Sequence, residues 1–138
     1  TSKIYNGYYR FGFVRNPWSH QVSLYYYMKQ RKDHFQYGII KDMSFDEYLD
    51  WRVNEDLHFQ KEYYYDDTGQ CLVDRIGKFE NLKQDFQTIC EEIGLKPINL
   101  SHINKSKHED YHILYSDKTK RLVQEVFQPD ILEFGYVF

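Results

Sequence analysis

The sequence predicts an α/β fold in which a mainly parallel sheet is flanked by helices. Two runs typical of strands, residues 8–14 and 71–79, are each followed by a stretch with helical periodicity. The connection between them is long enough for the crossover that parallel strands require. The chain has 138 residues, 19% of them aromatic, which allows one domain at most and supplies a packed core.

The first strand and helix are predicted to meet at an Asn-Pro pair. Residues 8–14 are largely apolar and aromatic, which indicates a buried strand. Asn16 suits a helix N-cap, and Pro17 suits the first helical position, where a missing N–H costs nothing. A helix is therefore expected over residues 17–34, with Gly38 ending that region.

The remaining boundaries are predicted from capping residues, glycine and proline. Ser44 and Glu47 have the spacing of a capping box. In chain order we expect a helix from Ser44 to about residue 53, a turn at Asp66–Gly69, a strand over Cys71–Phe79 closed by Gly77, a helix that Asn81 caps and Gly94 ends, a long loop over residues 96–115, and a helix that starts at Ser116 or Asp117 and stops at Pro129.

Composition excludes several classes of protein. A net charge of −3 argues against a broad nucleic-acid surface, so an anion site has to be local. No apolar run approaches the roughly 20 residues that span a bilayer, and no signal peptide is visible. Cys71 and Cys90 are too few for a disulfide framework and are expected as buried free thiols, typical of a reducing compartment. The histidine spacings match no metal motif, so no metal is expected.

A candidate anion site lies where the first strand ends. Arg15 follows the strand directly, so its guanidinium is delivered to the N-terminus of a helix, which attracts anions through its N–H groups and dipole. Arginine adds a permanently charged, bidentate donor that matches a phosphate. Ser23 follows two turns later. The alternatives are a surface arginine paired with a carboxylate and a serine bonded to its own helix.

The same residues carry a family resemblance. Arg-Asn-Pro at Arg15, a serine eight positions later at Ser23 and an aromatic residue at Tyr25 resemble the 3′-phosphate-binding motif of carbohydrate-type (family 2) sulfotransferases. Three further blocks follow in that family's order: Leu72–Leu82 with Asp85 and Phe86, Asn104–His108 with Asp110 and Tyr111, and Asp130–Phe138.

The resemblance implies a function and a set of ligands. Members of this family use 3′-phosphoadenosine 5′-phosphosulfate (PAPS) as the sulfuryl donor, need no metal and act on a hydroxyl group, here expected on a carbohydrate. By resemblance Arg15 and Ser23 hold the 3′-phosphate. Lys105, Ser106 and Lys107 fall in a loop that closes over the nucleotide, the alternative being a solvated basic turn.

The resemblance also implies a P-loop-like fold whose first strand and 5′-phosphosulfate loop precede the Arg-Asn-Pro strand. Neither has a counterpart in this sequence, so residues 1–138 are interpreted as a single, partial domain that is inactive alone. No catalytic base is identified, and the oligomeric state is left open. The expected compartment is the cytoplasm for a bacterial protein or the Golgi lumen for a eukaryotic one.

Two other functions fit the sequence. One is a non-catalytic module of the same fold that binds a nucleotide or a sulfated ligand. The other is a fragment of a P-loop kinase-like phosphotransferase, which would require a Walker-type loop and a Mg²⁺-binding carboxylate. No GxxxxGK[ST] motif occurs in the chain.

Overall fold

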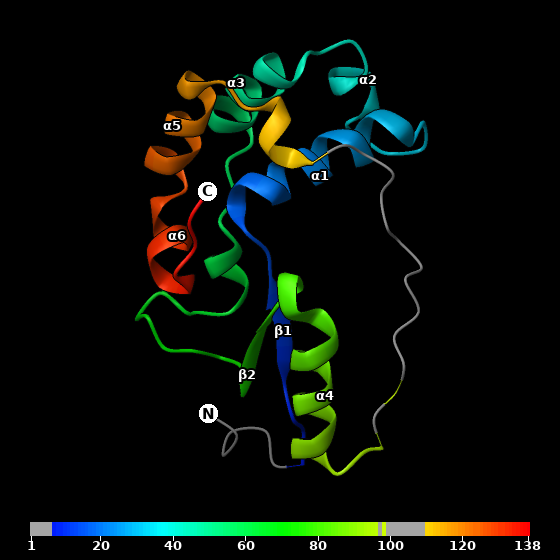
Figure 1. Ribbon diagram of the computed structural model, residues 1–138, viewed down its shortest axis with the longest axis vertical. Coiled ribbons are helices and arrows are strands. Elements are labelled where there is room, and N and C mark those ends of the chain that lie inside the picture. Colours follow the sequence, from blue (N-terminus) through cyan, green and yellow to red (C-terminus); the bar gives the residue numbers. More distant parts are fainter. Residues whose placement is uncertain (1–6, 97, 99–109) are drawn as a thin grey trace. The chain divides into compact units, whose positions relative to one another are not determined.

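The computed structural model describes residues 7–96, 98 and 110–138 (Figure 1). The chain divides into two compact units, one formed by Thr1–Arg15 with Gln60–Lys105 and the other by Asn16–Phe59 with Ser106–Phe138. Its elements, in chain order, are β1 (Phe11–Val14), α1 (Pro17–Gln30), α2 (Tyr37–Ile40), α3 (Phe45–Glu55), the 3₁₀ turn η2 (Gln60–Tyr63), β2 (Arg75–Lys78), the 3₁₀ turn η3 (Phe79–Asn81), α4 (Leu82–Ile93), the 3₁₀ turn η4 (Tyr111–Leu114), α5 (Asp117–Val126) and α6 (Gln128–Phe134).

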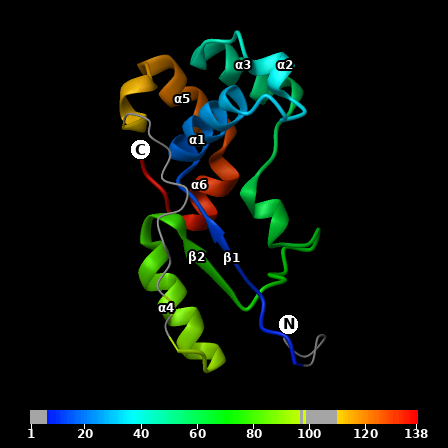
Figure 2. The same ribbon diagram turned by 90° about the vertical axis from the view of Figure 1, so that its right-hand side faces the viewer.

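The first unit contains a parallel strand pair covered by a helix. Strand β1 pairs with β2 in parallel, with Phe11 opposite Arg75. Helix α4 follows β2 and packs against it (Figure 2). Ile89 and Cys90 of α4 are almost fully buried, as is Val14 at the end of β1. This confirms the predicted mixture of helices with a small parallel sheet.

Both strands are shorter than predicted. Strand β1 covers residues 11–14 rather than 8–14, and it is not fully buried, because Phe11 at its start is 42% exposed. Strand β2 covers residues 75–78 rather than 71–79. In the described part of the chain the sheet has these two strands alone.

Gly77 does not close β2, as the sequence had indicated, but lies within it. A Cβ atom at this position would lie 2.5 Å from Cε1 of Phe13, so the residue is small because the neighbouring strand's ring packs over it. Asn81 occupies the predicted N-cap of α4, but its side chain makes no capping hydrogen bond. Gly94 ends α4 in the left-handed conformation, with φ of 78°, as predicted.

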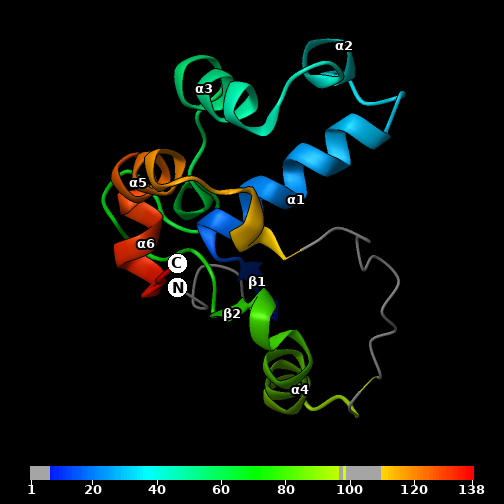
Figure 3. The ribbon, with the colours of Figure 1, turned by 45° about the horizontal axis from the view of Figure 1, so that its top comes forward.

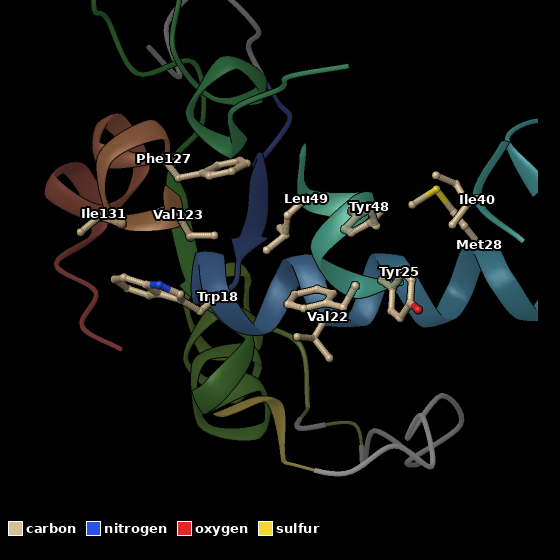
Figure 4. Close-up of a cluster of buried hydrophobic side chains, with 11 residues drawn as sticks. Trp18, Val22, Tyr25, Met28, Ile40, Tyr48, Leu49, Val123, Phe127 and Ile131 are labelled. Atoms are coloured by element: carbon tan, nitrogen blue, oxygen red, sulfur yellow. The ribbon is translucent and has the colours of Figure 1, made fainter. Parts of the chain in front are cut away.

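The second unit is a helical cluster around α1. Trp18, Val22, Tyr25 and Met28 recur every three or four residues and are buried, so one face of α1 forms the centre of the core. Figure 4 shows these side chains in a row along α1, with Ile40 beside Met28 at the far end. The other core residues come from α3, α5 and α6 and the residue that links the last two: Phe45, Tyr48, Leu49, Val123, Phe127 and Ile131.

Several helix boundaries in this unit confirm the capping predictions. The Ser44 Oγ accepts from the N–H of Glu47 at 3.2 Å, and the Glu47 carboxylate accepts from the N–H of Ser44, which completes the capping box of α3. Ser116 starts α5 in the same way, with Thr119 as its partner. Of the two predicted caps for this helix, Ser116 is therefore correct.

Other boundaries in this unit were wrong. Helix α1 ends at Gln30 rather than residue 34. Gly38 does not end the region but lies inside α2. Pro129 does stop α5, yet it also occupies the first turn of a further helix, α6, which directly follows α5 (Figure 3). Proline is accepted there because N–H groups of the first turn have no helical partner.

The cysteines are both free thiols. Cys90 is buried, as predicted, whereas Cys71 is only partly buried, because it precedes β2 instead of lying within a covered strand.

Candidate functional site

Arg15 lies immediately after β1 in the first unit, as the sequence predicts. Both of its main-chain polar groups bond to one side chain: the Arg15 N–H donates to Oε1 of Gln60 at 2.8 Å, and Nε2 of Gln60 donates to the Arg15 carbonyl at 2.7 Å. The guanidinium carbon lies 4.3 Å from the centre of the Phe79 ring. This cation–π contact stabilises the position of the guanidinium over the ring.

The next residue begins the second unit and caps α1. Asn16 is the N-cap, and its Oδ1 accepts from the N–H of Trp18 at 3.0 Å. Pro17 occupies the first turn, and the first helical hydrogen bond runs from His20 N to the Asn16 carbonyl at 2.8 Å. The first turn contains no acidic residue. The partial positive charge of this helix end is therefore not offset by a carboxylate of its own first turn.

Ser23 is on the partly exposed face of α1. His20, Ser23 and Tyr27 follow at spacings of three and four residues, so they share one stripe, and none of them is buried. The opposite face carries Trp18 and the rest of the core. Ser23 therefore lies one turn beyond His20 on the partly exposed face of the helix.

The predicted ligands belong to different parts of the chain. Arg15 is in the first unit and Ser23 in the second, and each is described within its own unit. Lys105, Ser106 and Lys107, predicted to close over a nucleotide, lie outside the described residues. The ligand roles of all five residues remain predictions.

The C-terminal block packs around the start of α1 in the second unit. Nδ2 of Asn16 donates to the Val137 carbonyl at 2.8 Å, and the ring of Phe138 lies edge-on to Trp18 with centroids 5.6 Å apart. The Tyr115 hydroxyl donates to the Trp18 carbonyl at 2.7 Å, and burial raises the pKa of this phenol. Tyr115 therefore stays protonated and keeps donating at neutral pH.

Sequence reasoning missed the contribution of Gln60. It lies in a polar, tyrosine-rich stretch that has no periodicity and no motif, so nothing local distinguishes it from its neighbours. Phe79 packs against the guanidinium of Arg15 while remaining 44% exposed. Arginine and an aromatic ring are a common pair, but the two residues are too far apart in sequence for the pattern to reveal the contact.

Other kinds of site are not seen in the residues that the structure describes. In these ranges no three His, Cys, Asp or Glu side chains gather in a way that could hold a metal ion. No helix in the same ranges is both long and apolar enough to cross a membrane. A surface hollow is lined by four residues of α5, Asp117, Lys120, Arg121 and Gln124, and neither Arg15 nor Ser23 is among the described residues that line it.

Comparison with known proteins identifies the family. A profile described as the sulfotransferase family matches residues 1–137. An uncharacterized protein of Archaeoglobus fulgidus is 33% identical over 113 residues, which cover 79% of this chain and 87% of the relative. No solved structure matches significantly. With a profile match over nearly its whole length, and with Arg-Asn-Pro between a strand and a capped helix, this chain belongs to the sulfotransferase family.

Proposed function

We propose that the protein functions in sulfuryl transfer from PAPS to the hydroxyl group of an acceptor, with a carbohydrate as the expected acceptor class. In this proposal the chain binds the donor's 3′-phosphate through Arg15 and Ser23. Lys105, Ser106 and Lys107 contribute cations and a hydroxyl near the phosphates. Membership of the sulfotransferase family supports the reaction class, since the family generally uses this donor.

The observation that carries the proposal is the junction of β1 with α1. Strand β1 ends at Val14, Arg15 follows, and α1 starts at Pro17 with Asn16 as its N-cap and no carboxylate in its first turn. A guanidinium offers two parallel N–H donors to a phosphate, and a helix N-terminus adds a favourable dipole. Ser23, on the partly exposed face of α1, supplies a neutral donor that a phosphate ester also accepts.

The reaction needs a donor that is held accurately. In sulfuryl transfer the acceptor oxygen attacks sulfur in line, the bond between sulfur and the oxygen of the 5′-phosphate breaks, and the acceptor proton passes to a base. Binding the 3′-phosphate at a distance from sulfur orients the donor and uses remote binding energy for positioning. That is the role proposed for Arg15 and Ser23, and the base is left unassigned.

Binding of 3′-phosphoadenosine 5′-phosphate (PAP), the product of the donor, tests the site. Titration calorimetry with PAP and with adenosine 5′-phosphate (AMP) isolates the contribution of the 3′-phosphate, because the two ligands differ only in that group. We expect the wild type to bind PAP more tightly than AMP. Arg15→Gln should lower the affinity for PAP by about 10- to 100-fold, as for a lost charge-assisted hydrogen bond, and leave the affinity for AMP unchanged. Arg121→Gln, at an exposed position of α5, is the matched control.

Phosphorus NMR gives a second measurement, because the 3′- and 5′-phosphates of PAP have separate resonances. Binding should shift the 3′ resonance equally in the wild type and in Arg121→Gln, and by less in Arg15→Gln. Equal affinity for PAP and AMP in the wild type would contradict the proposal. Tighter binding of ATP with Mg²⁺ than of PAP would favour phosphoryl transfer instead. Transfer of labelled sulfate from PAPS to a panel of sugars, phenols and tyrosine peptides then tests the acceptor class.

A further inference from the structure

The main-chain groups of β1 point to two different edges. N–H and C=O groups of alternate residues in a strand face opposite sides. The Arg10 carbonyl accepts from Asp74 N at 2.8 Å and from Arg75 N at 3.3 Å, so Arg10 and every second residue after it face β2. Phe13 and Arg15 therefore direct their main-chain groups to the other edge, away from β2.

Side chains, not a strand, occupy that outer edge at Phe13 and Arg15. Gln60 both accepts from the Arg15 N–H and donates to the Arg15 carbonyl, at 2.8 and 2.7 Å. This is the pair of hydrogen bonds that a residue of a neighbouring strand would make. At Arg15, the side-chain amide of Gln60 thus takes the place of the peptide groups of a neighbouring strand.

Tyr64 contacts Gly12 and Phe13, the residues of β1 that come shortly before Arg15. Its hydroxyl donates to the Phe13 carbonyl at 2.8 Å, and its ring lies so close over Gly12 that a Cβ there would be 2.2 Å from Cε1 of the tyrosine. Burial raises the pKa of Tyr64, so the hydroxyl remains a donor at neutral pH. Gln60 is the first residue of the 3₁₀ turn η2, and Tyr64 directly follows this turn, with its N–H donating to the Lys61 carbonyl.

The arginine side chain is held separately from its main chain. Phe79 is the first residue after β2, and its ring lies 4.3 Å from the guanidinium carbon of Arg15. The main chain is fixed by η2 and the side chain by the end of β2, so two independent elements of the same unit restrict one residue. Such preorganisation reduces the conformational freedom that an arginine loses when it binds an anion.

We propose that Gln60 is a positioning residue for Arg15: it fixes the arginine main chain at the end of β1, so that the guanidinium stacked on Phe79 is already ordered for the 3′-phosphate. Tyr64 extends the same support to Phe13. This inference rests on the function proposed above, because it takes Arg15 as the phosphate ligand. Gln60 itself does not touch the ligand.

A purely structural role for Gln60 makes a different prediction. Unpaired strand edges invite further strand pairing, and a side chain that covers an edge prevents it. If Gln60 only protected the edge, its loss would lower stability or promote association and would affect every ligand equally. If it acts through Arg15, its loss reduces the preference for PAP over AMP, and only while Arg15 is present.

The test is a double-mutant cycle on ligand preference. Gln60→Met keeps the length of the side chain but removes both hydrogen bonds. We expect it to lower the ratio of PAP to AMP affinity by about fivefold, with AMP affinity unchanged, and to reduce the shift of the 3′-phosphate resonance. In an Arg15→Gln background the same change should have no further effect on that ratio. Gln87→Met, on the exposed face of α4, is the matched control.

Tyr64→Phe covers the case in which Gln60→Met does not fold. It keeps the ring over Gly12 and removes only the hydrogen bond to Phe13, so we expect a decrease of about twofold in the same ratio. An unchanged ratio in both variants, or in Tyr64→Phe if it alone folds, overturns the positioning role, as does an equal loss of PAP and AMP affinity. The proposed function fails separately, and this inference with it, if the wild type does not prefer PAP or if Arg15→Gln leaves the preference intact.

Discussion

Nδ2 of Asn16 donates to the main-chain carbonyl of Val137 at 2.8 Å, across 121 positions of sequence. The same side chain accepts from the N–H of Trp18 through Oδ1 and so caps α1. One buried amide therefore connects two of the blocks on which the family resemblance rests, the Arg-Asn-Pro segment and the C-terminal segment. The asparagine of the motif is explained by this double contact, since both a donor and an acceptor are required.

Separate substitutions should resolve the two functions of Asn16. Asn16→Ala removes the cap and the bond to Val137 and should lower the free energy of unfolding by about 2 kcal/mol. Asn16→Asp keeps the capping acceptor but cannot donate to Val137, so it should be the less destabilised of the two. Urea denaturation monitored by tryptophan fluorescence measures both, with Asn54→Ala on the exposed face of α3 as the control. Equal losses in both variants would show that the cap contributes nothing.

An ion pair that includes a buried arginine should contribute more to the stability of the second unit than an exposed ion pair does. Arg52 is 7% exposed, and its Nη1 donates to Oδ2 of Asp56 at 2.5 Å. Asp56→Asn leaves the buried guanidinium without its counter-charge and should cost about 3 kcal/mol of unfolding free energy. Asp33→Asn breaks the exposed pair with Arg31 and should cost less than about 0.5 kcal/mol. Chemical denaturation of both variants gives the comparison, and similar losses would refute the assigned difference.

Alkaline pH should destabilise the second unit through Tyr48. Burial raises the pKa of this phenol to about 12, and its hydroxyl donates to Oε1 of Gln21 at 2.9 Å. An unfolded tyrosine ionises near pH 10, so between about pH 10 and 12 the unfolded state binds fewer protons than the folded state. The contribution of protonated Tyr48 to the free energy of unfolding is fully present below about pH 10. It is lost as the pH rises from about 10 to 12, and the loss amounts to about 2–3 kcal/mol.

Unfolding free energies measured in urea from pH 8 to 12 test this dependence. Tyr48→Phe should be less stable at pH 8, because Gln21 loses its donor, and should show a shallower decline above pH 10. Tyr27→Phe, at an exposed position of α1, controls for removal of a phenolic hydroxyl. A decline of the same steepness in Tyr48→Phe would show that other groups cause it.

Two glycines should respond in opposite ways to alanine. At Gly77 a Cβ would lie 2.5 Å from the Phe13 ring and 3.2 Å from Cβ of Asp85, so Gly77→Ala should cost about 1–3 kcal/mol. At Gly38, within α2, a Cβ meets nothing within 4 Å, so Gly38→Ala should leave stability unchanged or raise it by up to about 1 kcal/mol. Thermal denaturation followed by circular dichroism distinguishes the two, and a neutral Gly77→Ala would show that the Phe13 ring moves aside.

Features that depend on neighbouring residues were predictable from the sequence. The caps at Asn16, Ser44 and Ser116 and the stop at Gly94 each follow from chemistry within four residues. The arrangement of strand, arginine and capped helix followed as well, because each part has its own local signal. These features predict that Arg15 lies between a strand and a capped helix.

Features that depend on distant partners were not predictable. Gln60 pairs with Arg15 across 45 positions, and Gly77 is small because of a ring on another strand. The strands were predicted too long, since their apolar residues mark burial in general rather than the limits of hydrogen-bonded pairing. The second helix after Pro129 was missed because a proline that stops one helix also suits the start of another.

The parallel pairing of β1 with β2 has a consequence for the order of folding. Arg10 and Asp74, which meet at the start of this pair, are separated by 64 positions, and the intervening chain contains the first three helices of the other unit. During synthesis β1 emerges before β2 and cannot pair with it until the ribosome has released β2, whereas α1 and α3 can contact each other sooner. The helical cluster should therefore begin to assemble first, and the support for Arg15 should be among the later structures to form.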